Sequence, residues 1–302
     1  MSVADALAAI RTLEPDSEEI YQLFVVDRYG KLSGEISFRQ LVVATPTTLL
    51  QEIMNTEVIS VPVGADQEEV ARLVARYHLL ALPVVDGGGL LVGVITVDDV
   101  IDVLVEEATE DIQRLGATEP LEKPYLETPP LTVFRKRIGW LLLLFVTETF
   151  TGTVLCHFEN ELAVVVSLAF FIPLLIGTDG NAGSQTTSTI IRSLALGELD
   201  KVNFLKPLWH ELRVGVLLGL GMGIAAYARA LLWETGTGVA ITVGVAIFII
   251  VLWANILGSI LPLLANKFNV DPTVVSGPAM TTLVDATGLF IYFTVAGIML
   301  NL

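Results

Sequence analysis

Five apolar stretches, each long enough to cross a membrane as a helix, constrain the fold of this chain more than any other feature. A membrane helix needs about 20 mostly apolar residues, because it rises about 1.5 Å per residue through a hydrocarbon core about 30 Å thick. The stretches cover approximately residues 138–157, 162–182 (continuing with more polar residues to 196), 212–233, 239–264 and 273–301. We therefore predict an all-α membrane domain of five transmembrane helices.

The basic residues around these stretches predict their orientation. Arg135, Lys136 and Arg137 precede the first stretch, and further basic residues follow the second and the fourth. The loops "HFENEL" and "WETGTG" contain no Lys or Arg. Cytosolic loops carry an excess of Lys and Arg, so the N-terminus is predicted in the cytosol and the C-terminus outside. The N-terminal residues also lack the pattern of a signal peptide. We expect a multi-pass protein of the cell (inner) membrane, embedded in the lipid bilayer.

The acidic residues are concentrated before the apolar stretches. The net charge is −16, and residues 1–128 contain 23 acidic and 8 basic residues, whereas the rest of the chain contains 10 and 9. An acidic surface disfavours nucleic acid and anionic lipid. We therefore expect a soluble part whose partners are divalent cations or basic segments, and no nucleic acid.

The soluble part contains an internal repeat. "LFVVDRYGKLSGEISFRQL" (23–41) and "LPVVDGGGLLVGVITVDDV" (82–100) align without a gap at a period of 59 residues. Each copy predicts a strand, a turn rich in Asp and Gly, a second strand and a helix. The pair resembles tandem CBS domains, a regulatory module that often binds adenine nucleotides. The second copy has an opening strand at 57–64 and a helix at 66–78. The first copy has no counterpart of that strand, so an upstream region is expected to be missing.

Seven carboxylates lie close together where the soluble part approaches the membrane part. They are in the segment "DDVIDVLVEEATED" (98–111), which contains no basic residue. On a helix, residues 98, 102, 106 and 110 are spaced by four, and like charges at that spacing destabilise a helix by about 0.2–0.5 kcal/mol per pair. Divalent cations, which prefer oxygen ligands, would relieve the repulsion. A solvated acidic face is the alternative interpretation.

Two of the apolar stretches contain unusual polar residues. The second is predicted to break after Pro173 into the segment 177–183, because irregular backbone at membrane depth is tolerated when it lines a cavity. The fifth contains Asp285 about 12 residues after its start, near the predicted middle of the bilayer, where an Asp costs about 2.5–3.5 kcal/mol. Close helix packing is an alternative role for Thr281, Thr282 and Gly288, but packing does not require a carboxylate.

These features together resemble the MgtE family of magnesium transporters. The resemblance rests on the CBS pair, the acidic helix, "GNAGSQ…IIRSLALGELD" in the second stretch and "DP.VVSGP…TTL.DATGL.IYF" in the fifth. It implies a homodimer with its pore on the dimer axis, lined by the second and fifth helices, and a cytosolic gate that senses Mg²⁺. Mg²⁺ would thus be both substrate and regulator. The family usually carries a further acidic N-terminal domain, which this sequence lacks.

The resemblance also implies the site residues. In the pore they are Asp285, which would hold hydrated Mg²⁺, together with Asn181, Thr281, Ala286 and Gly288. In the cytosolic sensor they are Asp66, Glu68, Asp99, Asp102, Glu107, Glu110 and Asp111. The hydroxyl-x-x-Asp pattern that binds a ribose is intact at Thr96 and Asp99, whereas Ser37 is followed at that spacing by Gln40, so we predict at most one weak ATP site.

Four residues depart from the family pattern. His78 stands where an acidic ion ligand is expected, and Gly277 where an amide-bearing residue is expected. Glu148 and Asp179 stand where small or apolar residues are expected, and they would either add ion ligands or face the cytosolic mouth. Because neither acid belongs to the motif, we expect their substitution to have milder effects than substitution of Asp285.

The predicted fold class is an α+β tandem CBS domain followed by the all-α membrane domain. The predicted domains are 1–52 (first CBS), 53–108 (second CBS), 109–137 (connecting helix and linker) and 138–302 (membrane domain). A CBS-regulated anion channel or an intramembrane enzyme is the alternative function. An anion pore would need basic residues or helix N-termini, and an enzyme would need a nucleophile with a base, or metal ligands. We predict a transporter rather than an enzyme.

Overall fold

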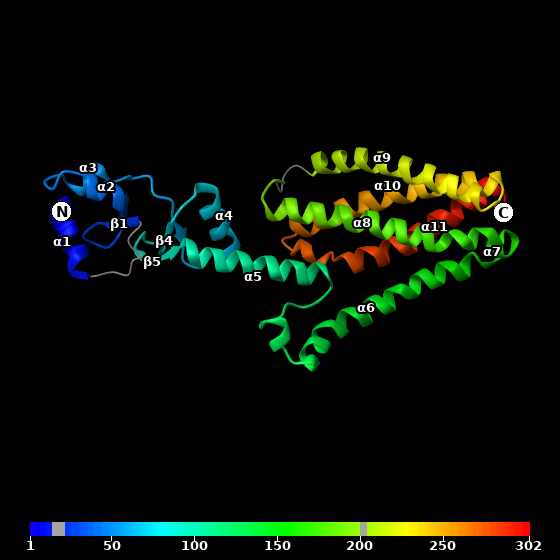
Figure 1. The fold of residues 1–302 in the computed structure, drawn as a ribbon, viewed down its shortest axis with the longest axis horizontal. Helices are drawn as coiled ribbons and strands as arrows, with labels where there is room; N and C mark the ends of the chain where they lie inside the picture. Colours follow the sequence, from blue (N-terminus) through cyan, green and yellow to red (C-terminus); the bar gives the residue numbers. More distant parts are fainter. Residues whose placement is uncertain (14–21, 200–203) are drawn as a thin grey trace. The chain divides into compact units, whose positions relative to one another are not determined.

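The computed structural model of the protein describes residues 1–13, 22–199 and 204–302 (Figure 1). The chain forms two compact units, residues 1–108 and residues 109–302. Each unit is described by itself, and helix α5 (Val97–Leu115) contributes residues to both.

The first unit contains two copies of a β-hairpin followed by a helix, at the predicted offset of 59 residues. Each hairpin has antiparallel strands and an irregularity at the same position, between Val25 and Val26 in one copy and between Val84 and Val85 in the other. The elements are β1 (Gln22–Val26), β2 (Leu32–Ser37) and α2 (Phe38–Val43) in the first copy, and β4 (Ala81–Val85), β5 (Leu91–Thr96) and α5 in the second.

The two hairpin turns are built alike and contact each other. Asp27 Oδ1 accepts hydrogen bonds from the backbone N–H groups two and four residues later, at 2.8 and 2.9 Å, and Asp86 Oδ1 does the same at 2.8 Å for both. An antiparallel bridge pairs Lys31 with Leu90, which are themselves equivalent positions. The copies are therefore related by a local two-fold axis through this bridge.

Helices complete a small core for each copy. The expected helix at 66–78 is observed as α4 (Gln67–Tyr77), with Asp66 as its N-cap. It buries Val70, Ala71 and Val74 against β4 and α5. The first copy packs around Ile36 and Leu41 and is covered by α1 (Val3–Leu13), which the sequence patterns above did not predict, and by the short α3 (Leu50–Ile53).

The opening strand of the second copy is much shorter than predicted. Only β3 (Val61–Pro62) of the segment 57–64 pairs with the sheet, parallel to β4. The resulting sheet has the order β3-β4-β5, whereas β1 and β2 form a two-stranded sheet among the described residues. The ladder that would extend β3 ends at Gly64, whose φ of +85° turns the chain toward α4.

The second unit contains five helices that are long and apolar enough to cross a membrane, counted over its described residues, as predicted. Helix α10 is the most buried of them and packs against α8, α9 and α11, which surround it (Figure 1). Helix α6 approaches the others mainly near its C-terminal end (Figure 1). The five helices are α6 (Pro130–His157), α8 (Ile172–Ala195), α9 (Leu205–Leu232), α10 (Thr237–Lys267) and α11 (Gly277–Leu300). Short elements between them are η1 (Tyr125–Glu127), α7 (Glu159–Val164), η2 (Val166–Phe171) and η3 (Pro272–Val274).

Two sequence predictions about the membrane helices are wrong. The segment 177–183 does not break the second span, because α8 is one continuous helix from Ile172 to Ala195. Gly180 and Gly183 allow close packing against α11, whereas nothing lies within 4 Å of a Cβ atom added at Gly177, and the Thr178 hydroxyl donates to the Leu174 carbonyl one turn earlier (2.7 Å). The fifth helix begins at Gly277 rather than near residue 273, after the cap of Ser276. Asp285 therefore lies on the third turn of α11, nearer the start of the helix than predicted.

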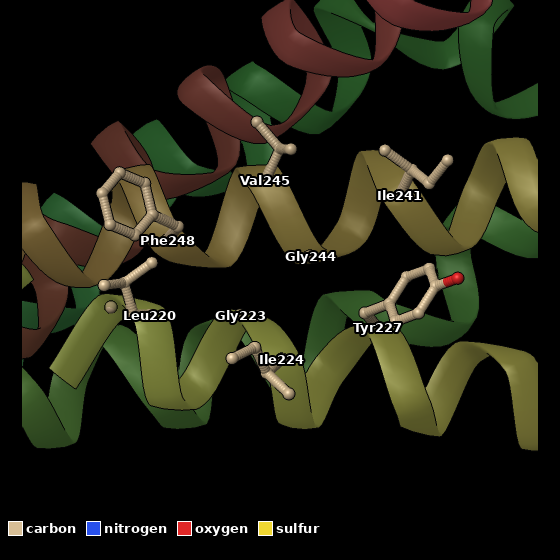
Figure 2. Close-up of a pocket in the computed structure, with 9 residues that line it drawn as sticks. Leu220, Gly223, Ile224, Tyr227, Ile241, Gly244, Val245 and Phe248 are labelled. Atoms are coloured by element: carbon tan, nitrogen blue, oxygen red, sulfur yellow. The ribbon is translucent and has the colours of Figure 1, made fainter. Parts of the chain in front are cut away.

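Helices α9 and α10 meet through glycines. A Cβ atom added at Gly223 would lie 2.7 Å from the Gly244 carbonyl oxygen, and one added at Gly219 would lie 2.9 Å from the Phe248 carbonyl oxygen. Close backbone approach through small residues is a usual way for membrane helices to associate. A shallow apolar groove of about 370 Å³ follows this crossing, and Figure 2 shows its lining: Leu220, Ile224 and Tyr227 from α9, and Ile241, Val245 and Phe248 from α10.

Candidate ion-binding site between two membrane helices

Helices α8 and α11 pack closely around two carboxylates. A Cβ atom added at Gly180 would lie 2.9 Å from the Thr281 methyl group and 3.7 Å from Asp285 Oδ1. A Cβ atom at Gly288 would overlap the carboxylate of Asp179. The absence of a side chain at Gly288 therefore leaves the space that the Asp179 carboxylate occupies, and its absence at Gly180 allows the close approach of Thr281.

Asp179 and Asp285 are both buried and are incompletely hydrogen-bonded. Their exposed fractions are 1% and 8%. Asp179 Oδ1 accepts a hydrogen bond from the Gly180 backbone N–H (2.7 Å), but Asp179 Oδ2 and Asp285 Oδ1 have no partner among the described residues. The two carboxyl groups are close enough to interact directly, and Glu148 of α6, which is exposed, acts electrostatically on Asp285.

This pair of carboxylates is costly unless something compensates it. Two like charges about 4 Å apart repel by about 4 kcal/mol at an effective dielectric constant of about 20. Removing each ion from water costs several kcal/mol more. Divalent cations such as Mg²⁺ are bound through one or two carboxylates while they keep several waters. The donor set at this interface, which offers oxygen atoms only, fits such an ion.

The predicted pore residues are only partly brought together. Thr281, Asp285 and Gly288 share the face of α11 that meets α8, because they are spaced by four and three residues. The Thr281 hydroxyl donates to the Pro278 carbonyl (2.9 Å), so its oxygen still has acceptor capacity. Asn181 of α8 is exposed, and Ala286 is half-buried, one residue past Asp285.

Sequence reasoning assigned Asp179 no definite role. No spacing in the sequence relates positions 179 and 285, which lie on helices separated by two other membrane helices. The signal that was available was the pair of glycines, Gly180 and Gly288, because a buried acid in a membrane helix needs a small neighbour. Within the chain, the acid next to Asp285 is Asp179.

Other polar contacts hold the helices around the site in register. Trp253 Nε1 of α10 donates to Thr287 Oγ1 of α11 (3.0 Å), and the Tyr292 hydroxyl donates to the Leu168 carbonyl (3.0 Å). Two turns farther along α8 from Asp179, the Thr186 hydroxyl donates to Asn255 Oδ1 of α10 (2.8 Å). Asn255 Nδ2 is a buried donor without a partner among the described residues.

Several of the predicted sensor residues are held in local hydrogen bonds. Asp66 caps α4 by accepting from the Glu68 N–H (2.9 Å), and Glu68 pairs with Arg72 at 3.5 Å. Gln67, between them, donates to Glu107 of α5. Asp99 accepts from the Thr96 hydroxyl (2.9 Å), and Asp102 is exposed. Within the described part of one chain, no three His, Cys, Asp or Glu side chains converge on a metal site, so the sensor stays a prediction.

Two of the four unusual residues have structural roles. His78 is the C-cap of α4 and adopts a left-handed conformation with φ of 54°. Gly277 begins α11, and its carbonyl accepts from the Ser184 hydroxyl of α8 at 3.5 Å.

The end of α5 is tied to the loop before α11 by an arginine. Arg114 pairs with Glu110, a predicted sensor residue, and with Asp271. Asp271 also accepts hydrogen bonds from the Thr273 N–H (2.9 Å) and hydroxyl (2.7 Å). Burial raises the pKa of the Asp271 carboxyl, but the hydrogen bonds from Thr273 and the Arg114 guanidinium outweigh burial and lower this pKa below its ordinary value.

The residues at the start of the helix that follows each hairpin, Ser37 and Gln40 in the first copy and Thr96 and Asp99 in the second, form different hydrogen bonds. Thr96 and Asp99 are hydrogen-bonded at the start of α5. In the first copy, Ser37 and Gln40 form a capping box, with the Ser37 hydroxyl donating to Gln40 Oε1 at 2.9 Å. A hydroxyl paired with a carboxylate at this spacing is thus present in the second copy, and its binding of a ribose stays a prediction.

Comparisons with known proteins agree with both units. The profile of the MgtE family, described as a divalent cation transporter, matches residues 172–295, and the CBS domain profile matches residues 50–106. The magnesium transporter MgtE of Thermus thermophilus is 44% identical over 301 residues, which are 100% of this chain and 67% of that protein. The magnesium transporter MgtE of Bacillus subtilis is 34% identical over 295 residues, 98% of this chain and 65% of that protein.

A solved structure also resembles part of the chain. It is a crystal structure of the cytosolic domain of the Mg²⁺ channel MgtE in complex with ATP, 52% identical, covering 34% of this chain and 42% of that chain with a TM-score of 0.33. This chain spans 67% of the length of the relative from Thermus thermophilus and 65% of the length of the relative from Bacillus subtilis.

A CBS pair followed by five helices long and apolar enough to cross a membrane is the architecture of a multi-pass membrane protein. The chain belongs to the MgtE family. The predicted fold class, an α+β CBS pair followed by an all-α membrane domain, is thereby confirmed.

Proposed function

We propose that this protein carries Mg²⁺ across the membrane through a pore on the axis of a homodimer, lined by α8 and α11, with Asp285 as the principal ion-binding residue. The observation that carries the proposal is Asp285 itself, a buried carboxylate on a membrane helix with an unpartnered oxygen. Packing alone does not require such a group, whereas a hydrated divalent cation would compensate its charge. Membership in a family of divalent cation transporters supports the choice of cargo.

The first test is Mg²⁺ flux into liposomes that contain the purified protein. Asp285→Asn keeps the size of the side chain and its hydrogen-bonding capacity but removes the charge. We expect this variant to lose most or all Mg²⁺ flux while it still elutes as a folded protein, and Asp285→Ala should behave alike. Wild-type flux in Asp285→Asn would leave Asp285 as a structural hydrogen-bonding group, and the proposal would be abandoned.

We further propose that the protein is a homodimer whose cytosolic part closes the pore when internal Mg²⁺ is abundant. A homodimer is supported by apolar side chains that α5 leaves exposed: Ile101 at 54%, Leu104 at 46% and Val105 at 61%. The acidic side chains of α5 lie on the same helix, so cation binding would relieve repulsion there and draw the two copies of the soluble unit together.

In the proposed orientation, the N-terminus is cytosolic and the C-terminus is outside, as the basic loops suggest.

Gating has its own test. Protease resistance of the soluble part should rise at millimolar Mg²⁺, and internal Mg²⁺ should inhibit flux. Asp99→Ala combined with Asp102→Ala should weaken both effects, because it removes two carboxylates of the predicted sensor. If both effects persist unchanged in the double variant, the acidic stripe is a solvated face and has no part in gating.

Alternative functions find less support at the site. An anion pathway would need basic groups, whereas the polar side chains at the α8–α11 interface are carboxylates and hydroxyls. Arg229, near the end of α9, lies over the Trp233 ring at 4.5 Å and is engaged there.

A further inference from the structure

We propose that Asp179 is a second ligand for the transported cation, so that Asp179 and Asp285 of one chain form a two-carboxylate site between α8 and α11. This inference rests on the proposed function and deepens it, because it assigns a binding role to an acid that the family motif does not include.

The burial of Asp179 is the first argument. Its side chain is 1% exposed, and it lies against the one face of α11 that also carries Asp285. A carboxylate that served only to pair with a base would have that base beside it. Among the described residues, no Lys, Arg or His side chain forms an ion pair or hydrogen bond with Asp179 or Asp285.

The unpartnered oxygens are the second argument. Asp179 Oδ2 and Asp285 Oδ1 both lack a hydrogen-bond donor, although both are shielded from water. Buried polar atoms in proteins almost always have a partner, and those without one often mark an absent water or ion. Asp179 Oδ2 lies beside Gly288 of α11, Asp285 Oδ1 lies beside Gly180 of α8, and the two carboxyl groups interact directly, which fits a cation held between them.

The chemistry of the donors selects the class of cation. Only oxygen atoms are available: two carboxylates, with the Thr281 hydroxyl oxygen nearby on the same face of α11. Oxygen ligands suit hard divalent cations such as Mg²⁺ and Mn²⁺, whereas imidazole and thiolate ligands suit zinc and copper. With only two carboxylates, the ion would keep most of its water shell, which is the usual mode for Mg²⁺.

The glycines explain how the site is held open. Gly288 leaves room for the Asp179 carboxylate, and Gly180 leaves room for Thr281, one turn before Asp285. The site is therefore built into the crossing of two rigid helices rather than into a loop. Ion affinity should depend on both acids together, because neither carboxylate alone supplies the two charges that neutralise a divalent ion.

Trp253 provides a local probe of this site. Its indole N–H donates to Thr287 Oγ1, and Ile250, one turn earlier on α10, lies beside Gly288, where the Asp179 carboxylate also lies. The chain has four tryptophans, so replacing Trp140, Trp209 and Trp233 by Phe leaves Trp253 as the single fluorophore. Mn²⁺ is paramagnetic and quenches nearby fluorescence, so a Mn²⁺ titration of this full-length variant in detergent micelles measures binding near Trp253, and its dependence on Asp179 and Asp285 assigns that binding to the α8–α11 site.

The experiment compares Asp179→Asn, Asp179→Gly and Asp285→Asn in this background, with Glu159→Gln as the matched control because Glu159 is an exposed acid at the start of α7. Asp179→Asn and Asp179→Gly should each raise the Mn²⁺ concentration for half-maximal quenching at least tenfold. The same two variants, without the tryptophan replacements, should raise the Mg²⁺ concentration for half-maximal flux by a similar factor. Combining Asp179→Asn with Asp285→Asn should lower affinity less than the product of the two single effects, because both side chains would bind one ion.

The outcomes separate this inference from the proposed function. If wild type carries Mg²⁺ and both Asp179 variants match Glu159→Gln in quenching and in flux, Asp179 is not a ligand and the carboxyl pair is held by a shared proton instead. If wild type carries no Mg²⁺, the proposed function fails, and the Trp253 titration still decides whether the two acids bind a divalent cation.

Discussion

Replacing Gly288 by alanine tests the geometry of the carboxylate site with one methyl group. The added Cβ atom would overlap the carboxylate of Asp179, while its next neighbour, Ile250 Cγ2, lies at an ordinary 3.4 Å. The methyl group must therefore displace Asp179, which has little room to move because it is 1% exposed. On the same helix, nothing lies within 4 Å of a Cβ atom added at Gly297, which makes Gly297→Ala the matched control.

The expected magnitude follows from two opposing effects. Forcing an extra methyl group into a well-packed interior costs about 1–3 kcal/mol. Replacing glycine by alanine inside a helix gains about 0.5–1 kcal/mol. Gly297→Ala should therefore raise the free energy of unfolding slightly, and Gly288→Ala should lie about 1–3 kcal/mol below it. Denaturant unfolding of the protein in detergent micelles, followed by tryptophan fluorescence, measures this difference.

A second background identifies the group that the methyl meets. In a variant that also carries Asp179→Gly, the carboxylate is gone, and Gly288→Ala should cost nothing, like Gly297→Ala. A penalty of equal size with and without Asp179 would mean that another part of the structure resists the methyl group, and the close contact between Asp179 and Gly288 would be refuted.

Two further predictions concern the parts outside the membrane helices. Because the pKa of Asp271 is lowered in the folded state, its carboxylate stabilises the fold above its unfolded pKa of about 3.9, and this stabilisation is lost as the pH falls through the lower folded pKa. Asp271→Asn should thus lower the free energy of unfolding at pH 7 by about 1 kcal/mol or less, since the Arg114–Asp271 pair is over a third exposed. If the variant is destabilised by the same amount at acid pH as at pH 7, the ionised Asp271 carboxylate does not stabilise the fold. Calorimetry with ATP should find at most one site per chain, removed by Asp99→Ala and unaffected by Gln40→Ala, whereas two equivalent tight sites would disprove the role assigned to Thr96 and Asp99.

Much of this organisation could be predicted from local sequence patterns. The five apolar stretches identified the membrane helices, because helix length and hydropathy are properties of consecutive residues. The 59-residue period predicted equivalent hairpins, and the strands Gln22–Val26 and Ala81–Val85 are offset by that interval. Helix capping is local in the same way, because the side chains of Asp66 and Ser276 accept hydrogen bonds from backbone N–H groups two and three residues later.

The tertiary structure decided what depends on contacts between distant residues. Glycine and threonine in the segment 177–183 look like helix breakers in sequence, but α8 stays continuous. Membrane surroundings favour internal backbone hydrogen bonds, and α11 packs closely beside Gly180 and Gly183. Likewise, no sequence pattern relates Asp179 to Asp285, and only the crossing of α8 and α11 brings their carboxylates together. Hydropathy can thus identify a membrane helix, but the partner of a buried charge is set by which helices pack against each other.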